Sequence, residues 1–252
     1  MSDSLVSCIT VTYGRPILLG EAVKCFIDQT YPNKELIIVN DQEGVTLKMD
    51  SERDDIQIHN IPERFNSLGE KRNYAMSLAK GEYICVWDDD DLYPFWRIQD
   101  SIKIMNTQRG YDIVKGQMAL MSTNDTNYMV VNNLFHSQAM ITKKYVKSHL
   151  YPNKSVGEDG DYEREARVSS YPVDPFYLYV YRWGLGIHHL SGILDEKKSW
   201  RRSLEFEPYL QLKGEIKIKP EFQKDHWNNV IEFFRIKKPE YAEQWVKRFS
   251  EK

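Results

Sequence analysis

The feature that most limits the fold of this 252-residue chain is a strand, a helix and a second strand in its opening segment. Residues 5–11 (LVSCITV) form a β-branched, apolar run typical of a buried strand. Apolar side chains then recur at helical spacing after Pro16, a residue suited to the first turn of a helix. A second apolar run at 35–39 completes the unit, which predicts parallel strands joined by a right-handed crossover.

The alternation continues to about residue 106. We expect a strand at 56–61, a helix at 67–79, a strand at 83–87 and a helix from 94 to 106. Ser67 and Glu70 have the spacing of a capping box at the start of the second helix. Strands alternating with helices predict an α/β fold with a mostly parallel, Rossmann-like sheet flanked by helices.

The order of elements becomes mixed in the second half. We expect strands at 111–114, 128–131 and 176–182, helices at 143–148 and 161–168, and a polar, mostly helical segment after residue 200. Lys and Arg outnumber Asp and Glu by 14 to 9 from residue 197 onward, although the whole chain carries a net charge of −3. This basic end is typical of a solvated helical face, and it is also compatible with a polyanionic partner.

The remaining composition favours a cytoplasmic location. No apolar run reaches the roughly 18 residues of a membrane-spanning helix, and the first residues lack the basic start of a signal peptide. The three cysteines lie in apolar stretches without a CxxC pair, which indicates buried free thiols in a reducing compartment.

Polar side chains follow three of the predicted strands. They are residues 10–13 after the first strand, Asp41 after the second, and the run Asp88–Asp91 after the strand at 83–87. Ligands of open parallel sheets bind outside the carboxyl ends of the strands, so we expect these groups to meet. Four consecutive carboxylates repel one another, and a divalent cation would relieve that repulsion. The run therefore predicts a metal site, with a solvated acidic turn as the alternative.

Short motifs occur in a characteristic order. They are VTYGRP at 11–16, QTYP at 29–32, ELIIVND at 35–41, SLGEKRN at 67–73, AKGEYI at 79–84, DDDD at 88–91, GED at 157–159, WG at 183–184 and HLSG at 189–192. In these motifs the chain resembles the inverting family 2 glycosyltransferases of the GT-A fold. The resemblance implies a catalytic domain at 1–196, with a nucleotide-sugar-binding half at 1–110, an acceptor and base half at 111–196, and a C-terminal extension at 197–252.

The resemblance also implies a donor site and a metal, Mn²⁺ or Mg²⁺. The donor-binding positions are Thr12, Tyr13, Arg15, Asp41, Arg72, Asn73, Asp88 and Asp89. The metal ligands are Asp90, Asp88 and His189, although a register slipped to Asp89 and Asp91 stays open, and a turn histidine is often structural. Asn40 stands where the family usually has Asp, so the base, expected to be uracil, rests on the resemblance alone.

The same resemblance implies an acid–base apparatus. Asp159 would be the general base, with Glu158 as its substitute, unless the pair is only an acidic helix cap. Asp161, Trp183 and Trp87 are candidate acceptor contacts, although both tryptophans also suit a core. The expected acceptor is a glycan, an envelope component or a small molecule.

Three other functions compete with this one. The basic stretch containing Lys197, Lys198, Arg201 and Arg202 allows a DNA acceptor with a hydroxymethylated base. A sugar- or nucleotide-binding module without catalysis is the second alternative. Nucleotidyl transfer is the third, but the loop after the first strand is too short and too poor in glycine for it.

Overall fold

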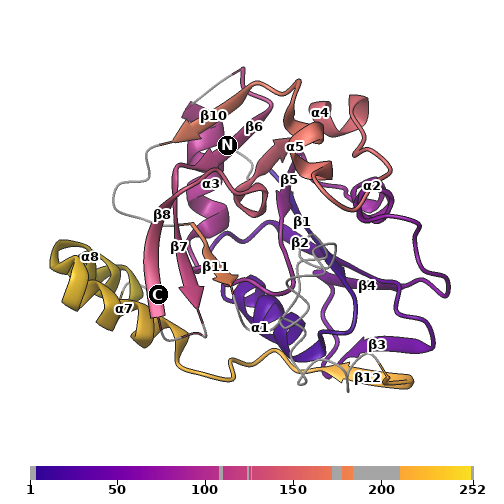
Figure 1. The fold of residues 1–252 in the computed structure, drawn as a ribbon, viewed down its shortest axis with the longest axis horizontal. Coiled ribbons are helices and arrows are strands. Elements are labelled where there is room, and N and C mark those ends of the chain that lie inside the picture. Colours follow the sequence, from indigo (N-terminus) through magenta and orange to yellow (C-terminus); the bar gives the residue numbers. More distant parts are fainter. Residues whose placement is uncertain are drawn as a thin grey trace, which may run out of the picture.

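The computed structural model describes residues 4–107, 110–123, 125, 127–171, 178–183 and 211–250. Within them, the main sheet has seven strands in the order β10-β6-β9-β5-β1-β2-β4 (Figure 1). Its strands are β1 (Val6–Thr12), β2 (Lys34–Asn40), β4 (Ile56–Asn60), β5 (Tyr83–Val86), β6 (Ile113–Gly116), β9 (Met140–Thr142) and β10 (Val168–Tyr171). Only β9 runs antiparallel to its neighbours in this described sheet, which confirms the mostly parallel α/β architecture.

Helices cover both faces of the sheet. The helical elements are α1 (Pro16–Ile27), α2 (Leu68–Leu78), α3 (Arg97–Thr107), η1 (His136–Gln138), α4 (Lys143–Ser148), α5 (Glu158–Glu163), α7 (His226–Lys237) and α8 (Pro239–Ser250). Successive strand residues point to opposite faces, so Cys8 and Leu36 pack with α1, whereas Ile9 and Ile37 pack with α2. Hydrophobic packing on both faces holds the sheet between the helices. Functional side chains are therefore expected at the ends of its strands.

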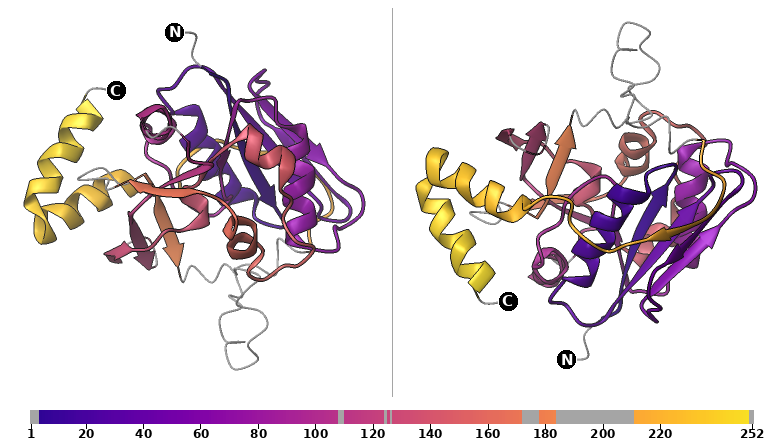
Figure 2. Two further views of the ribbon diagram at one scale, coloured as in Figure 1. Left: turned by 90° about the horizontal axis from the view of Figure 1, so that it is seen from above. Right: turned by 90° about the horizontal axis from the view of Figure 1, so that it is seen from below.

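Two smaller sheets extend the structure. They are formed by β7 (Met118–Thr123), β8 (Asn127–Asn132) and β11 (Val180–Trp183), and by β3 (Val45–Met49) with β12 (Gly214–Ile218). The pairing of β12 with β3 joins the C-terminal segment to the first half of the chain. Helices α7 and α8 then form a hairpin on one side of the molecule (Figure 2), where Trp245 packs against Trp96 with ring centroids 4.9 Å apart.

Some predicted elements differ from the structure. The helix expected at 161–168 is wrong in its bounds, because α5 begins at Glu158 and the chain is extended again from Val168. Gly157 has φ 68°, a left-handed conformation that directs the chain into α5. The mostly helical C-terminal segment also contains a strand, β12. The strand expected at 176–182 corresponds to β11, and residues 172–177 lie outside the described part.

Candidate active site

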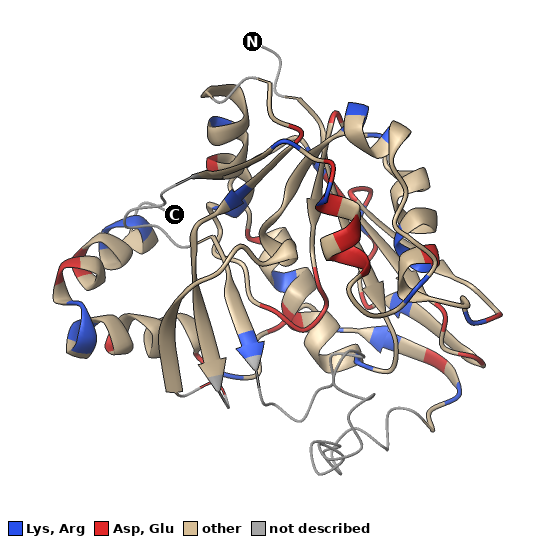
Figure 3. Ribbon diagram, turned by 45° about the horizontal axis from the view of Figure 1, so that its top comes forward, with Lys and Arg blue, Asp and Glu red and all other residues tan. Residues whose placement is uncertain are grey.

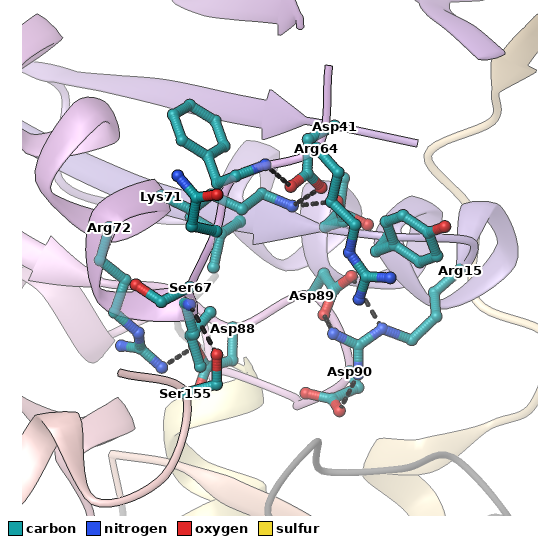
Figure 4. Close-up of a pocket in the computed structure, with 16 residues that line it drawn as sticks. Arg15, Asp41, Arg64, Ser67, Lys71, Arg72, Asp88, Asp89, Asp90 and Ser155 are labelled. Atoms are coloured by element: carbon teal, nitrogen blue, oxygen red, sulfur yellow. Dashed lines mark hydrogen bonds and ion pairs between the residues drawn. The ribbon is translucent and has the colours of Figure 1, made fainter. Parts of the chain in front are cut away.

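A pocket of about 390 Å³ opens at the carboxyl ends of β1, β2 and β5 (Figure 4). It is lined by Val11, Thr12, Tyr13, Arg15, Asp41, Arg64, Phe65, Asn66, Ser67, Leu68, Lys71, Arg72, Asp88, Asp89, Asp90 and Ser155. The polar groups that follow the three strands therefore meet in one cavity, as expected for ligand sites of parallel sheets. The cavity combines apolar and polar side chains and carries charges of both signs.

One end of the pocket holds a buried ion pair between Lys71 and Asp41. The Lys71 Nζ lies 2.5 Å from Asp41 Oδ1 and donates to the Thr12 carbonyl oxygen at 2.6 Å. The other Asp41 oxygen accepts from the Phe65 backbone N–H at 3.1 Å. Burial lowers the pKa of Lys71, while the neighbouring Asp41 carboxylate opposes that shift. Lys71 has no role predicted from the sequence, although its position one turn after Ser67, beside the strand ends, could have indicated one.

Tyr13 and Arg64 stand together at the same end. The Arg64 guanidinium carbon lies 4.4 Å from the centroid of the Tyr13 ring, a distance typical of cation–π contact. Both side chains line the cavity, and Figure 4 labels Arg64 beside Asp41. Sequence reasoning missed Arg64, because the residues around it form no motif. A flat aromatic ring next to a buried carboxylate can stack and hydrogen-bond a planar heterocycle.

The acidic run divides its carboxylates among different partners. Arg15 pairs with Asp89 at 2.6 Å and with Asp90 at 2.5 Å. Asp88 accepts from the hydroxyl of Ser137. Burial raises the pKa of Asp89 to about 7, against the opposing effects of the Arg15 charge and a hydrogen bond from Thr12. Arg15 thus supplies part of the positive charge that balances the acidic run.

Asp91 serves a different purpose from its neighbours. Its oxygens accept from the Tyr179 hydroxyl at 2.7 Å and from the Arg182 backbone N–H at 2.9 Å. It does not line the pocket, and burial raises its pKa well above the ordinary range. Asp91 therefore anchors the segment that leads into β11. The slipped register, which needed Asp91 as a metal ligand, is disfavoured for this reason.

The carboxylates on the pocket wall fit a metal that is shared with a ligand. Asp88 and Asp90 present the oxygen donors that Mg²⁺ and Mn²⁺ accept. No group of three or more His, Cys, Asp or Glu in the described residues could hold an ion alone. Such an ion would take its other ligands from water and from phosphate oxygens, as Mg²⁺ commonly does in nucleotide sites.

The Glu158–Asp159 pair begins α5, whose acidic residues appear red in Figure 3. Glu158 is 5% exposed, with Oε1 3.7 Å from Arg72 Nε, and the same guanidinium lies 3.6 Å from Asp88. Asp159 is only partly buried, and its Oδ1 accepts from the Gly160 backbone N–H at 2.7 Å. Neither carboxylate lines the pocket, but Arg72, which does, connects Glu158 with the acidic run.

The loop before α5 is docked on the first turn of α2. The α2 backbone N–H groups of Leu68 and Gly69 donate to Ser155 Oγ and the Lys154 carbonyl oxygen, each at 3.1 Å. Glu70 N–H donates to Ser67 Oγ, as the capping box predicts, but the Glu70 carboxylate accepts from Asn66 instead of Ser67. These amides are therefore already satisfied, and they hold the loop before the Glu158–Asp159 pair at the pocket.

Other predicted site residues have structural roles or are not described. Trp87 is fully buried, stacks on Tyr93 and donates to the Ala22 carbonyl oxygen, so its predicted acceptor contact is wrong. The Asn73 side chain does not line the pocket; it pairs with the backbone of Tyr151 at 2.8 and 2.9 Å, and its donor contact stays a prediction.

Asp161 pairs with Lys154 and Arg164 away from the pocket lining. Trp183 ends β11, but its side chain is not described. His189 and the basic stretch at 197–202 lie outside the described residues.

Comparisons with known proteins identify a family and several similar proteins. Residues 7–162 match the family described as Glycosyl transferase family 2. An uncharacterized glycosyltransferase of Methanocaldococcus jannaschii is 25% identical over 223 residues, which cover 78% of this chain and 77% of that protein. The Escherichia coli UDP-Glc:alpha-D-GlcNAc-diphosphoundecaprenol beta-1,3-glucosyltransferase WfaP is 31% identical over 107 residues, which cover 42% of this chain and 43% of that one.

A solved structure shares the fold. Residues 1–349 of Staphylococcus aureus TarS, in complex with UDP-GlcNAc, superpose with a TM-score of 0.56 at 14% identity. The match covers 73% of this chain and 60% of the TarS chain. The present chain thus spans less than two thirds of the TarS chain and less than half of the Escherichia coli relative.

Proposed function

Because the chain belongs to glycosyl transferase family 2 and is therefore a glycosyltransferase, we propose that it transfers a sugar with inversion from a UDP-sugar to an acceptor hydroxyl. The observation that carries this proposal is the layout of the pocket. Figure 4 shows the buried carboxylate of Asp41 on one side of the cavity and Arg15 with Asp88, Asp89 and Asp90 on the other, and the lining also contains the aromatic ring of Tyr13. A nucleoside diphosphate has the same order of chemistry, with a planar base at one end and a metal-binding diphosphate at the other.

At the nucleoside end, Tyr13 offers a ring for stacking and Asp41 an acceptor for an N–H of the base or a ribose hydroxyl. Lys71 holds that carboxylate in place through its 2.5 Å ion pair. Uracil presents an imide N–H that a carboxylate can accept, and the UDP-linked donors of the Escherichia coli relative and of the TarS complex support this base. The Arg64 guanidinium stacks on Tyr13 in this structure. When a base binds, it would either move aside or pair with the phosphate next to the ribose.

At the diphosphate end, Asp90 and Asp88 would hold Mn²⁺ or Mg²⁺. When bound, such a cation stabilises the negative charge that develops on the departing diphosphate. Arg15 contacts Asp89 and Asp90 and is in reach of the same charge, so it binds and orients the phosphates from the protein side. Arg72 contributes a second guanidinium, whose buried Nε has no hydrogen-bond partner among the described residues.

The base in our proposal is Asp159. Inverting transfer forms a bond between the acceptor oxygen and the anomeric carbon as the bond to the diphosphate breaks, and one carboxylate takes the acceptor proton. Glu158 is buried beside the Arg72 guanidinium, which suits a positioning contact. Asp159 is more exposed and has no cationic partner among the ion pairs of the described residues. We infer a glycan or envelope component as the acceptor, in line with the sugar acceptor in the name of the Escherichia coli relative.

Replacing the proposed base tests this function. We expect Asp159→Asn to bind the donor as the wild type does, but to release nucleoside diphosphate from a UDP-sugar about 100-fold more slowly, because general-base catalysis contributes factors of that order. Nucleotide release and nucleotide affinity are measured side by side. Glu165→Gln, on an exposed carboxylate after α5, is the matched control. Full turnover in Asp159→Asn would remove the base from the proposal.

A further inference from the structure

A buried polar network lies behind the pocket, in residues that the proposed chemistry does not use. His136 is 7% exposed, and its Nδ1 lies 2.5 Å from Glu163 Oε1 while its Nε2 lies 2.6 Å from the Tyr151 hydroxyl. Glu163 is the last residue of α5 and also pairs with buried Lys115. A carboxylate only accepts hydrogen bonds, so Nδ1 carries the proton toward Glu163. Both ring nitrogens are therefore used, and the ring has one orientation.

The network contacts the surroundings of the Glu158–Asp159 pair from two sides. Through Glu163 it holds the end of the six-residue helix that begins with Glu158 and Asp159. Through Tyr151 it reaches Arg72, whose guanidinium carbon lies 5.6 Å from the centroid of the Tyr151 ring and which spans Asp88 and Glu158. A helix of less than two turns has little stability of its own, so its position depends on such tertiary contacts.

The neighbouring residue in the same turn serves the donor side. Ser137, next to His136 in η1, donates its hydroxyl hydrogen bond to Asp88 on the pocket wall. Within three residues, η1 therefore contacts both a carboxylate of the donor pocket and the helix that carries the proposed base. Burying a charged group costs free energy unless the group is paired. Because the buried charges of this network need their partners, the positions of His136, Glu163 and Lys115 depend on one another.

We propose that His136 is a positioning residue, which sets the place of Glu158 and Asp159 relative to the donor through Glu163 and Tyr151. The inference rests on the proposed function of the pocket, but it assigns a role to a residue outside that pocket. Small displacements of a catalytic group are costly, because misplacement by about 1 Å can reduce a rate by about 100-fold. His136 thus acts on the rate of transfer, whereas Ser137 acts on donor binding.

Two substitutions in one turn separate these roles. His136→Phe keeps a ring of similar shape and removes both hydrogen bonds, and Ser137→Ala removes only the contact with Asp88. For the full chain we expect His136→Phe to lower kcat for UDP release from a UDP-sugar by about 10- to 100-fold, with KM for the donor within about 2-fold. Ser137→Ala should do the reverse, by raising KM and leaving kcat within about 2-fold. Unchanged kcat in His136→Phe, or equal losses of kcat and affinity, would overturn the proposal.

Amide hydrogen exchange decides the proposal without any substrate. We expect His136→Phe to accelerate exchange of the α5 amides, while Ser137→Ala leaves α5 at the wild-type rate. Glu163→Leu should loosen α5 at least as much as His136→Phe, because it removes the same hydrogen bond from the other side together with the pair with Lys115. If the wild type binds no nucleotide but α5 loosens as described, the proposed function fails, and with it the role of His136 relative to a donor, although His136 still holds α5 in place. If nucleotide binds and α5 exchange is unaltered in His136→Phe, the positioning role fails alone.

Discussion

At the scale of single residues, the acidic run shows how one motif can hold several roles. Asp90 and Asp88 face the pocket, Asp89 is buried against Arg15, and Asp91 anchors the segment before β11. The sequence predicts that all four aspartates follow a strand, but it does not predict the directions of their side chains. Those depend on partners far along the chain, such as Tyr179, which no local pattern connects with the run.

Removing Arg15 should make the run depend on a metal. Breaking a buried ion pair leaves an uncompensated charge, so we expect Arg15→Met to lose about 3 kcal/mol of unfolding free energy in EDTA. Because a divalent cation can neutralise the same carboxylates, Mn²⁺ should restore part of that loss. Urea unfolding with Mn²⁺ or EDTA measures both quantities.

Arg64→Met is the matched control, since Arg64 lines the same pocket and contacts the Tyr13 ring. Arg64→Met should lose about 0.5–1 kcal/mol of unfolding free energy, and this loss should be the same with Mn²⁺ and with EDTA. If Mn²⁺ raised the free energy of unfolding equally in the two variants and in the wild type, the idea that a metal can replace the charge of Arg15 would be contradicted.

At the scale of elements, most of the first half of the fold and part of the second were predictable: α4 has the predicted bounds, and β8 and β6 lie within two residues of theirs. The strands β1, β2 and β5 and the helices α1 and α2 were each predicted to within a few residues, because their apolar periods are clear and Pro16 and Ser67 mark helix starts. The short strands β7, β9 and β12 have no comparable pattern. They exist because partner strands and the sheet edge complete their hydrogen bonds, which is non-local information.

The contact between α2 and the loop before α5 depends on Gly69. A Cβ at this position would lie 2.0 Å from the Pro152 carbonyl oxygen, so backbone must shift. We expect Gly69→Ala to cost about 1–3 kcal/mol, although alanine is the better helix former. Gly160→Ala, in α5, meets nothing within 4 Å and should be neutral or stabilising by less than about 1 kcal/mol. Urea unfolding compares the two, and equal effects would show that the loop does not need this close approach.

At the scale of the whole molecule, a buried charge network joins the C-terminal hairpin to the sheet. Arg182 in β11 pairs with Glu21 of α1 at 2.7 Å and with Asp125 at 3.0 Å. His226 at the start of α7 lies 2.8 Å from Glu21. These residues are up to 205 positions apart in sequence, so no motif could have predicted the network.

No helix of the described residues combines the length and the apolar character that crossing a membrane requires.

The network predicts how stability depends on pH. Burial alone would raise the pKa of Glu21, but the His226 hydrogen bond and the Arg182 charge outweigh it and lower the pKa from 4.5 to about 2. The stabilisation is therefore complete above pH 4.5 and is lost as the pH falls toward 2. In that window the wild type should lose up to about 1.4 kcal/mol per pH unit more than Glu21→Gln. Parallel curves of unfolding free energy against pH for the two proteins would contradict this linkage.

The central claim is that the pocket binds a nucleoside diphosphate together with a metal. The most direct test is calorimetric titration of UDP and GDP into the wild type and into Asp90→Asn, with Mn²⁺ and with EDTA. We predict that UDP binds in Mn²⁺, and that its affinity falls at least about 10-fold, or 1.4 kcal/mol, in EDTA and in Asp90→Asn. Binding of neither nucleotide, or binding that is indifferent to both metal and Asp90, would contradict the account.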